Sequence, residues 1–330
     1  MAVYGDQIVD LSPVLNLEQR VPRIITSLNL FSTDYHATDL IEVDRDVEAA
    51  GIIPARERNG ERNWLTDNRP NGKIFRAPFF PLDHNIKPVD VQSFRDFLLR
   101  ADELETIPAT ITRYTTKIQR AIDRTKERIF TASIMGYAFT GSTGSVNSAY
   151  NYYDEWGVTQ QSIAIDFTST TVDPASVIEA EARGYIVDQR QDDSATTTVI
   201  CLCGRQFFAA ITSNAFTRAA YSFYQGTPNP LRDRISGNAN FQTFEYKGVI
   251  YVEVDSDMIA TDEAYLLPTD VDGMLQAHYA PADTIGAANQ VAADQYLFMI
   301  ETLRTVQLQS DFSLLAVNTR PELVVHLTMA

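Results

Sequence analysis

The chain has 330 residues, of which 45% are hydrophobic and 21% are charged, a composition typical of a globular protein that excludes global disorder. Its 27 basic and 43 acidic residues give a formal net charge of −16, which disfavours nucleic-acid binding unless the cations gather on one face. The longest apolar runs have only the length of strands, so we expect no membrane span. The N-terminus lacks the pattern of a signal peptide, and we expect a cytosolic site of synthesis.

The first 30 or so residues predict an extended arm. Pro13 and Pro22 interrupt short apolar clusters, so this segment needs another surface to bury it. The apolar and polar residues of "DLIEVDRDVEAAGIIP" then alternate, which predicts a strand followed by a turn.

Residues 55–80, "ARERNGERNWLTDNRPNGKIFRAPFF", form a basic segment that is rich in turn signals. The segment holds six basic residues against three acidic ones, together with one of only two tryptophans in the chain. It has almost no core pattern, so we expect a surface outside the segment to bury it. The candidate contact residues are Arg56, Arg58, Arg62, Trp64, Arg69, Lys73 and Arg76.

The spacing of isoleucines predicts one long helix from Thr106 to Ala138, about 50 Å in length at 1.5 Å per residue. Pro108 lies in the first turn, where its missing N–H costs nothing, and Gly141 supplies a stop. The helix contains many threonines, which are weak helix formers, so packing along its apolar stripe must hold it. Two shorter helices joined by a bend are the alternative. The stripe consists of Ile107, Ile111, Tyr114, Ile118, Ile122 and Ile129.

The rest of the chain predicts an α+β mixture without an alternating βαβ series. "TVDPASVIEAEARGY" predicts a helix with Asp173 as N-cap and Pro174 at its first position. "FQTFEYKGVIYVEVD" predicts a hairpin that turns at Lys247 and Gly248. "GSTGSVNSAYNYYDEWGV" predicts another hairpin, "TTTVICLCG" a buried strand, and "RQFFAAITSNAFTRAAYSFYQ" a helix. The last 35 residues predict one or two long strands.

The sequence contains no motif for nucleotide binding, for a zinc protease or for a nucleophile elbow. Cys201 and Cys203 share one face of a strand and are expected to be small core residues, because they are poorly placed for a disulfide. The histidines fall in separate segments without ligand spacing, so we expect each at the surface or at an interface. They are His36, His84, His278 and His326.

A string of carboxylates between residues 255 and 272 raises the possibility of a calcium site. Apolar residues occupy positions where an EF-hand loop needs ligands, so a solvated loop is the better interpretation. We therefore predict no catalytic residue, no metal site and no cofactor, and we predict that the protein is not an enzyme. The string consists of Asp255, Asp257, Asp262, Glu263, Asp270 and Asp272.

The order of arm, basic loop, long helix, α+β body and terminal strand resembles the major capsid proteins of tailed double-stranded DNA phages, in the family of the phage lambda major head protein (capsid protein E). The resemblance rests on "GIIPARERNG", "ITRYTTKIQRAIDRTKERI", "NFQTFEYKGVIYVEVD", "HYAPADT" and "LQSDFSLLAVNTRPELVVHL". It covers the chain from about residue 30 to the end, and the C-terminal stretches are the most specific.

The resemblance implies an HK97-like fold. By it, residues 1–34 are an N-terminal arm, and residues 35–85 hold an extended loop, the E-loop, that lies over an adjacent subunit. Residues 86–190 and 296–330 form a peripheral domain around a spine helix, and residues 191–295 form an axial domain.

The function implied is a structural shell protein that assembles as pentamers and hexamers into an icosahedral head. The head encloses double-stranded DNA without sequence-specific binding. Portal, scaffolding and decoration proteins are the further partners implied, and the protein is expected in the virion and, during assembly, in the host cytoplasm. A tail-tube or decoration protein, or a hydrolase with an unrecognised acidic site, are the alternatives.

In the setting of this family, we predict that the basic segment reaches a neighbouring copy of the chain. Arg56, Arg58 and Arg62 are expected to pair there with carboxylates, and Trp64 is expected to pack beside them. Each exposed ion pair is worth only about 0–1 kcal/mol, so the contribution depends on repetition at every subunit contact.

Overall fold

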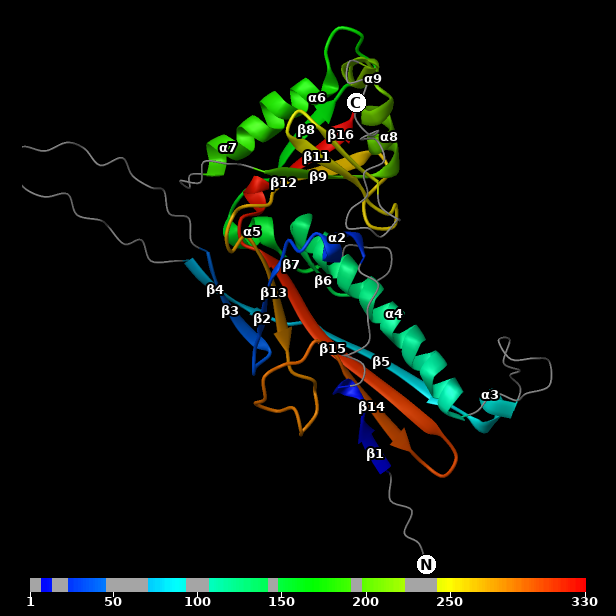
Figure 1. The fold of residues 1–330 in the computed structure, drawn as a ribbon. Helices are drawn as coiled ribbons and strands as arrows, with labels where there is room; N and C mark the ends of the chain where they lie inside the picture. Colours follow the sequence, from blue (N-terminus) through cyan, green and yellow to red (C-terminus); the bar gives the residue numbers. More distant parts are fainter. Residues whose placement is uncertain are drawn as a thin grey trace, which may run out of the picture.

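A computed structural model describes residues 7–13, 23–45, 71–92, 107–141, 148–190, 198–222 and 242–330. Helices and strands are mixed along the chain without an alternating βαβ series, which confirms the predicted α+β class (Figure 1). Within the described residues, no helix has the length and apolar character needed to cross a membrane.

The long sheet runs through the lower part of the molecule in Figure 1, with strand order β1–β14–β15–β13–β2. Strand β15 is its axis: β14 and β13 pair in succession along one edge, and β5 pairs along the other. The strands are β1 (Gln7–Asp10), β2 (Ser32–Tyr35), β5 (Phe79–Ile86), β13 (Leu275–Ala280), β14 (Tyr296–Glu301) and β15 (Val306–Asn318).

The upper sheet has strand order β10–β11–β9–β12–β16–β8. Helices α6 and α7 flank it on one side and α8 and α9 on the other (Figure 1). Its strands are β8 (Gln161–Ile165), β9 (Val199–Cys203), β10 (Thr243–Tyr246), β11 (Val249–Glu253), β12 (Glu263–Pro268) and β16 (Val325–Met329). The flanking helices are α6 (Pro174–Val177), a π-helical segment (Ile178–Arg183), α7 (Gly184–Arg190), α8 (Arg205–Ser213) and α9 (Ala215–Ser222).

The smaller elements include two hairpins and three short helices. The hairpins are β3 (Leu40–Arg45) with β4 (Asn71–Arg76), and β6 (Tyr137–Phe139) with β7 (Ser148–Asn151). The short helices are α2 (Ile24–Ser27), α3 (Pro88–Gln92) and α5 (Tyr152–Trp156), and a 3-10 turn (Pro321–Leu323) precedes β16.

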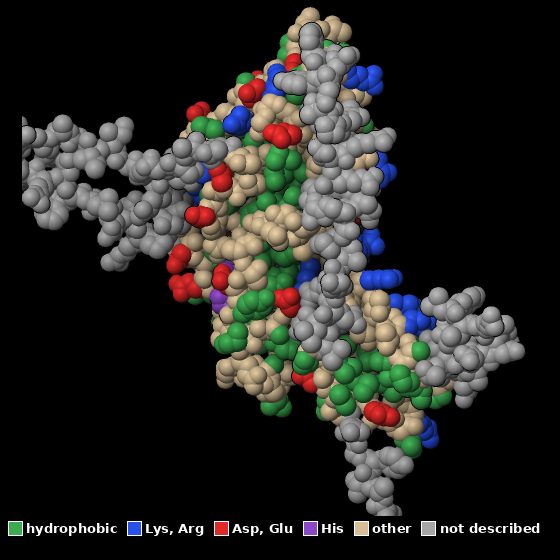
Figure 2. Space-filling model, viewed as in Figure 1, with side chains coloured by type: hydrophobic (Ala, Val, Ile, Leu, Met, Phe, Trp, Pro, Cys, Tyr) green, Lys and Arg blue, Asp and Glu red, His purple; other side chains and the backbone are tan. Residues whose placement is uncertain are grey.

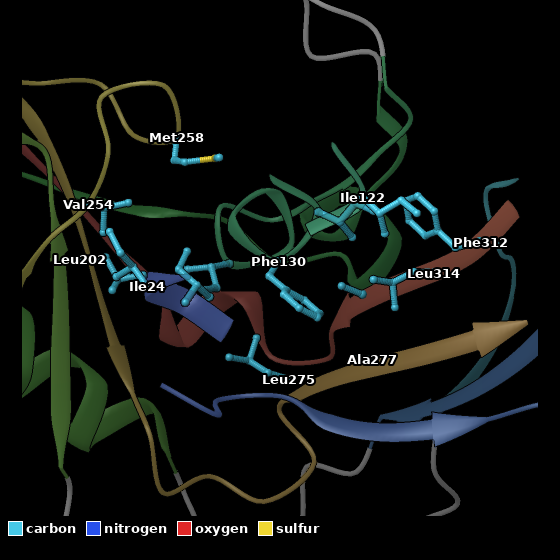
Figure 3. Close-up of a cluster of buried hydrophobic side chains, with 14 of the residues drawn as sticks. Ile24, Ile122, Phe130, Leu202, Val254, Met258, Leu275, Ala277, Phe312 and Leu314 are labelled. Carbon is cyan, nitrogen blue, oxygen red and sulfur yellow. The ribbon is translucent and has the colours of Figure 1, made fainter. Parts of the chain in front are cut away.

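The predicted long helix is a single element, α4 (Ile107–Ile134), of 28 residues and about 42 Å. It has no break into two helices, and its stripe from Ile111 to Ile129 packs in the core that contains β15 of the long sheet (Figure 3). Ile107, the first predicted member of the stripe, is exposed. The predicted stop at Gly141 is wrong. The helix ends before Gly136, whose φ of 100° is open to glycine but strained for other residues.

One hydrophobic cluster connects the two large sheets. Phe130 of α4 and Ile24 of α2 lie between Leu202 of the upper sheet and Leu314 of the long sheet (Figure 3). Since both sheets bury residues in the same cluster, α4 and α2 fix how the sheets sit relative to each other. Apolar burial of this kind is the dominant favourable term in folding.

Several local predictions are confirmed. Asp173 caps α6 by accepting a hydrogen bond from the backbone N–H of Ala175, and Pro174 occupies the first turn. The hairpin β10–β11 turns at Lys247 and Gly248, which have φ values of 52° and 71°. Positive φ at both central residues is the geometry of a tight two-residue hairpin turn.

Two element boundaries differ from the prediction. The helix expected over residues 205–225 breaks at Asn214, whose side chain accepts a hydrogen bond from the N–H of Phe216 and starts α9. The C-terminal region holds three strands, because Thr302 and Thr305 form a turn closed by their own hydrogen bonds between β14 and β15. Serine and threonine hydroxyls can close turns in this way.

The strand pairing groups distant parts of the chain. Strand β13 belongs to the long sheet although it lies within residues 191–295, and β16 belongs to the upper sheet although it follows residue 296. Strand β8 and helices α6 and α7, from residues 86–190, also lie with the upper sheet (Figure 1). The expected arm contributes two strands, β1 and β2, to the long sheet of its own chain.

Candidate assembly surface

The hairpin formed by β3 and β4, here called the base hairpin, carries the predicted loop segment between its strands. Ile41, Val43 and Phe75 on its inner face are buried. Phe75 meets the rings of Tyr150, Tyr152 and Trp156 edge-on, with centroid distances of 5.1, 6.1 and 6.0 Å. A two-stranded hairpin is marginal alone, so this aromatic contact helps to hold it to the body.

The aromatic residues that receive the base hairpin are fixed to β15. The Tyr152 hydroxyl donates to the carbonyl of Ala316 at 2.5 Å, and the Trp156 indole N–H donates to the carbonyl of Asn318 at 3.1 Å. Burial raises the pKa of Tyr152 well above its usual range, so its hydroxyl stays a donor. The base hairpin is therefore attached to the longest strand of the molecule through α5.

The outer face of the base hairpin has no cover within the described residues. Leu40 and Ile74 expose 58% and 67% of their surface, and Glu42 and Asp44 lie beside them, also exposed. Glu42 stands directly opposite Ile74 in the strand register. A two-stranded ribbon with apolar side chains on its open face is a surface that another chain can cover.

A chain of charged groups ties the end of β3 to the body. The Arg45 guanidinium contacts Glu322 at 2.8 Å, donates to the carbonyl of Trp156 at 3.4 Å and lies 5.8 Å from the Trp156 ring centroid. Arg320 approaches the same Glu322 at 3.5 Å and donates to the carbonyl of Arg190 at 2.8 Å. Arg190 in turn pairs with Asp270 at 3.2 Å.

These contacts link the base hairpin to α7 and to the loop before β13. Groups of this kind that are mostly buried must be paired, because an uncompensated charge away from water costs several kcal/mol. The strand end from which the loop departs is therefore held by ionic contacts as well as by apolar ones.

The structure describes two of the seven predicted contact residues. Lys73 pairs with Glu155 of α5 at 2.8 Å, and Arg76 pairs with Asp39 at 2.8 Å. Both ion pairs are internal to the chain. Lys73 lies near the end of the base hairpin from which the loop departs, whereas Arg76 lies at the opposite end, across from Leu40. The other five, Arg56, Arg58, Arg62, Trp64 and Arg69, lie outside the described residues.

The sequence reasoning missed Arg45, Trp156 and Glu322. Arg45 and Glu322 are 277 residues apart, and no local pattern connects them. The available signal was Trp156 itself, one of two tryptophans, in an aromatic run "YNYYDEW" inside the segment predicted as a hairpin.

A second attachment point joins the N-terminal region to α4. Glu127 of α4 is buried and accepts hydrogen bonds from the backbone N–H of Ile25 at 2.7 Å and of Thr26 at 3.2 Å, and from the Thr26 hydroxyl at 2.8 Å. Burial raises the pKa of this carboxyl, and the hydrogen bonds from Ile25 and Thr26 oppose that effect. Helix α2 is thus anchored to the C-terminal third of α4.

The expectation for the histidines is wrong for His278, which exposes only 4% of its surface. Its Nδ1 lies 3.0 Å from Nε2 of His36, and its Nε2 lies 3.0 Å from Oε1 of Gln276. These two contacts fit a neutral ring that donates to Gln276 and accepts from His36. Strand β2 pairs with β13 in parallel, and this pairing brings residues 36 and 278 together.

Burial lowers the pKa of His278 to about 4, and the neighbouring His36 acts in the same direction. Asp34, 3.9 Å away and largely exposed, has an opposing but smaller effect. A base with a depressed pKa in the folded state loses stability when it must be protonated. The contribution of neutral His278 is fully present above pH 6.5 and disappears as the pH falls towards 4.

We expect the wild-type protein to lose about 3 kcal/mol of stability between pH 6.5 and 4 through His278 alone, since each pKa unit corresponds to about 1.4 kcal/mol. The His278→Gln variant cannot be protonated there, so its free energy of unfolding should fall less steeply over this range. Urea unfolding at several pH values measures the difference between the two. Equal slopes for both proteins, with a His84→Gln control on β5 that behaves as wild type, would show that His278 does not titrate on unfolding.

The acidic string does not form a metal site in the described part of the chain, where no group of three or more His, Cys, Asp or Glu side chains could hold an ion. Its members have separate contacts instead. Asp257 pairs with Arg124 of α4, Glu263 approaches His326 at 3.3 Å, and Asp270 pairs with Arg190. Cys201 and Cys203 are free, buried core residues of β9, as predicted.

Comparison with known proteins gives consistent matches over nearly the whole chain. The family model of "Phage major capsid protein E" matches residues 7–329. The major capsid protein of Pseudomonas phage KPP10 is 22% identical over 338 residues, which cover 96% of this chain and 95% of that protein.

Solved structures show the same fold at low sequence identity. The putative capsid protein of a prophage of E. coli CFT073 matches with a TM-score of 0.53, 14% identity and 92% coverage of both chains. The capsid of cyanophage P-SCSP1u matches with a TM-score of 0.53, 10% identity, and coverage of 95% of this chain and 90% of that one. The fold is therefore the HK97-like fold.

Proposed function

The chain belongs to the phage major capsid protein E family, and from this premise we propose that it assembles as pentamers and hexamers into an icosahedral head that encloses double-stranded DNA. It is a structural capsid protein of the virion, it associates with copies of itself, and it is not an enzyme. The match of the family model over residues 7–329 carries this conclusion. The same match favours a shell protein over the tail, decoration and hydrolase alternatives.

The two sheets support a division into two working parts. The long sheet with α4 corresponds to the peripheral domain, and the upper sheet with its flanking helices corresponds to the axial domain near the five- and six-fold axes. Residues 1–34 serve as the arm, and residues 35–85 as the loop region. Strand β13 pairs in the long sheet and β16 pairs in the upper sheet, although the predicted residue ranges put each in the other domain. This pairing supports a domain boundary that follows the two sheets.

The base hairpin supports a role for the loop in joining subunits. Its inner face is fixed to the body by Phe75 and Arg45, whereas its outer face exposes Leu40 and Ile74. A rigid base with an open apolar face suits a loop that lies over an adjacent subunit. Portal, scaffolding and decoration proteins are further partners of the assembly, which takes place in the host cytoplasm.

We expect the Arg56→Glu/Arg58→Glu/Arg62→Glu variant to stay soluble and folded but to form no shells. Each lost ion pair is worth only about 0–1 kcal/mol, but the loss recurs at every subunit contact. In addition, the three introduced glutamates would repel the carboxylates of the neighbouring copy. Circular dichroism checks the fold of the variant, and negative-stain microscopy scores the shells.

The matched control is Arg205→Glu/Arg218→Glu/Arg304→Glu, which makes the same change of charge at exposed positions outside the loop region. This control should still assemble. Normal shells from the loop variant at physiological salt would refute the role given to the three loop arginines.

A further inference from the structure

Helix α4 carries a row of cations along the side that faces away from the long sheet. The spacing of four, three, four and four residues keeps their side chains on one face of the helix. The row runs from residue 113 to residue 128, a rise of 15 steps or about 22 Å at 1.5 Å per residue. It consists of Arg113, Lys117, Arg120, Arg124 and Arg128, and is here called the cation row.

Figure 2 shows the resulting asymmetry of the surface. Lys and Arg side chains follow the edge of the molecule where α4 runs, whereas Asp and Glu side chains gather towards the opposite edge, beside the base hairpin. A chain with a net charge of −16 therefore keeps a local basic strip. This strip is the concentrated basic face that an acidic protein needs before it can approach a polyanion.

The C-terminal end of the cation row contacts Asp257 of the body, and Arg113 at the N-terminal end is half-buried. Arg124 pairs with the Asp257 side chain, and Arg128 donates to the carbonyl of Asp257. Lys117 and Arg120, in the middle of the row, are exposed and have no carboxylate within ion-pair distance among the described residues. These two cations are available to an external anion.

The surroundings of the cation row are polar. Thr112, Thr116 and Thr125 lie nearby, and each hydroxyl bonds back to a helix carbonyl at 2.8–3.0 Å. Beyond Ile107 at its first position, α4 exposes no large apolar side chain. Interfaces between proteins concentrate apolar and aromatic anchors at their centre, whereas surfaces that contact phosphates are basic and polar. The composition of this face favours a phosphate backbone over a second copy of the chain.

We propose that the cation row of α4 is a contact surface for the phosphate backbone of duplex DNA, without sequence preference. Along one strand of the duplex, phosphates follow each other at about 3.4 Å of helix axis, so a straight row of about 22 Å can lie along several of them. The inference rests on the proposed function, because a shell that encloses DNA presents that DNA at high local concentration. A few phosphate contacts per chain are then enough for binding. The rest of the acidic surface repels the phosphate backbone, so the DNA stays able to move.

The test is the salt dependence of DNA binding by the full-length chain, measured by fluorescence anisotropy with a 30-base-pair duplex of arbitrary sequence. The Lys117→Gln/Arg120→Gln variant removes two phosphate contacts. At about 0.9 per contact, the slope of log K against log salt should become shallower by about 1.8, and affinity at 50 mM salt should fall roughly 100-fold. Both positions are exposed, so the fold should not change.

Two controls remove the same charge elsewhere. Arg205→Gln/Arg304→Gln alters α8 and the turn before β15, and Arg56→Gln/Arg58→Gln alters the basic loop. Both should keep the wild-type slope. Absence of DNA binding by the wild type, or an equal loss in either control, would overturn the inference.

Negative-stain microscopy of the same variants separates this inference from the proposed function. Shells formed by Lys117→Gln/Arg120→Gln together with weakened DNA binding support the DNA contact. Loss of shells with unchanged DNA binding would instead assign the cation row to a contact between copies and would overturn the inference. Absence of shells from the wild-type chain would count against the proposed function alone.

Discussion

Replacing Phe75 with alanine is expected to detach the base hairpin from the body and to abolish shell formation. Phe75 is almost completely buried and is in edge-on contact with Tyr150, Tyr152 and Trp156. Truncating a buried phenylalanine costs about 3–5 kcal/mol through lost burial and the cavity left behind. The hairpin has only two strands, so it has little other stability to set against this loss.

The effect should be local, because Phe75 belongs to a small cluster distinct from the core that joins the two large sheets. Hydrogen exchange should show loss of protection in residues 40–45 and 71–76, with the upper sheet unaffected. The control is Ile74→Ala, one position away on the exposed face, which should leave the protection unchanged. Shells formed by Phe75→Ala at wild-type yield would mean that the hairpin is not needed for assembly.

Replacing Gly136, just after the end of α4, with alanine should strongly lower the stability of the protein. Its φ of 100° is strained for any residue with a Cβ, and that Cβ would overlap the ring of Tyr153. Backbone strain and overpacking each cost about 1–3 kcal/mol, so we expect about 4 kcal/mol together. The carbonyl of Gly136 also accepts a hydrogen bond from the N–H of Tyr152 at 2.8 Å. A shift of the backbone at Gly136 would therefore disturb α5, on which the base hairpin packs.

Gly157 offers a matched control. It also has a positive φ, 65°, but an added Cβ there would meet no atom within 4 Å. Gly157→Ala should therefore cost about 1 kcal/mol, from backbone strain alone. Urea unfolding of both variants measures the difference. Equal destabilisation of the two variants would show that Tyr153 moves away from the added Cβ without a cost in stability.

Features encoded within a few residues of each other could be predicted from the sequence. The isoleucine spacing predicted α4, the Asp-Pro pair predicted the start of α6, and Lys247 with Gly248 predicted the turn of a hairpin. In each case the determinant is local: a helical period, a cap that satisfies a free N–H, or a residue pair that accepts positive φ.

Features that depend on strand pairing could not be predicted in the same way. Nothing in the sequence shows that β2 lies beside β13. The contact between His36 and His278 could therefore not be predicted, and His278 was expected at the surface or at an interface. The contact of Arg45 with Glu322 depends likewise on where the base hairpin and the C-terminal turn meet. The end of α4 was missed because Gly136 was passed over for the later Gly141, although both have positive φ.

The basic loop and the base hairpin together suit a contact between subunits. A basic loop in an acidic chain indicated that its partner lies outside the segment, and the structure adds a base for that loop that is fixed on one face and open on the other. The cation row of α4 is a separate basic surface, on the opposite edge of the molecule from the base hairpin (Figure 2). The protein therefore has two separate basic regions, the loop and the cation row, although its net charge is negative.

The central claim is that this chain builds a closed shell in which the loop of each copy is held by the base hairpin against a neighbour. Electron cryomicroscopy of particles assembled from the wild-type chain tests it most directly. We predict icosahedral shells of pentamers and hexamers, with Leu40 and Ile74 covered by an adjacent subunit. Tubes, monomers, or shells in which both side chains remain open to solvent would contradict this account.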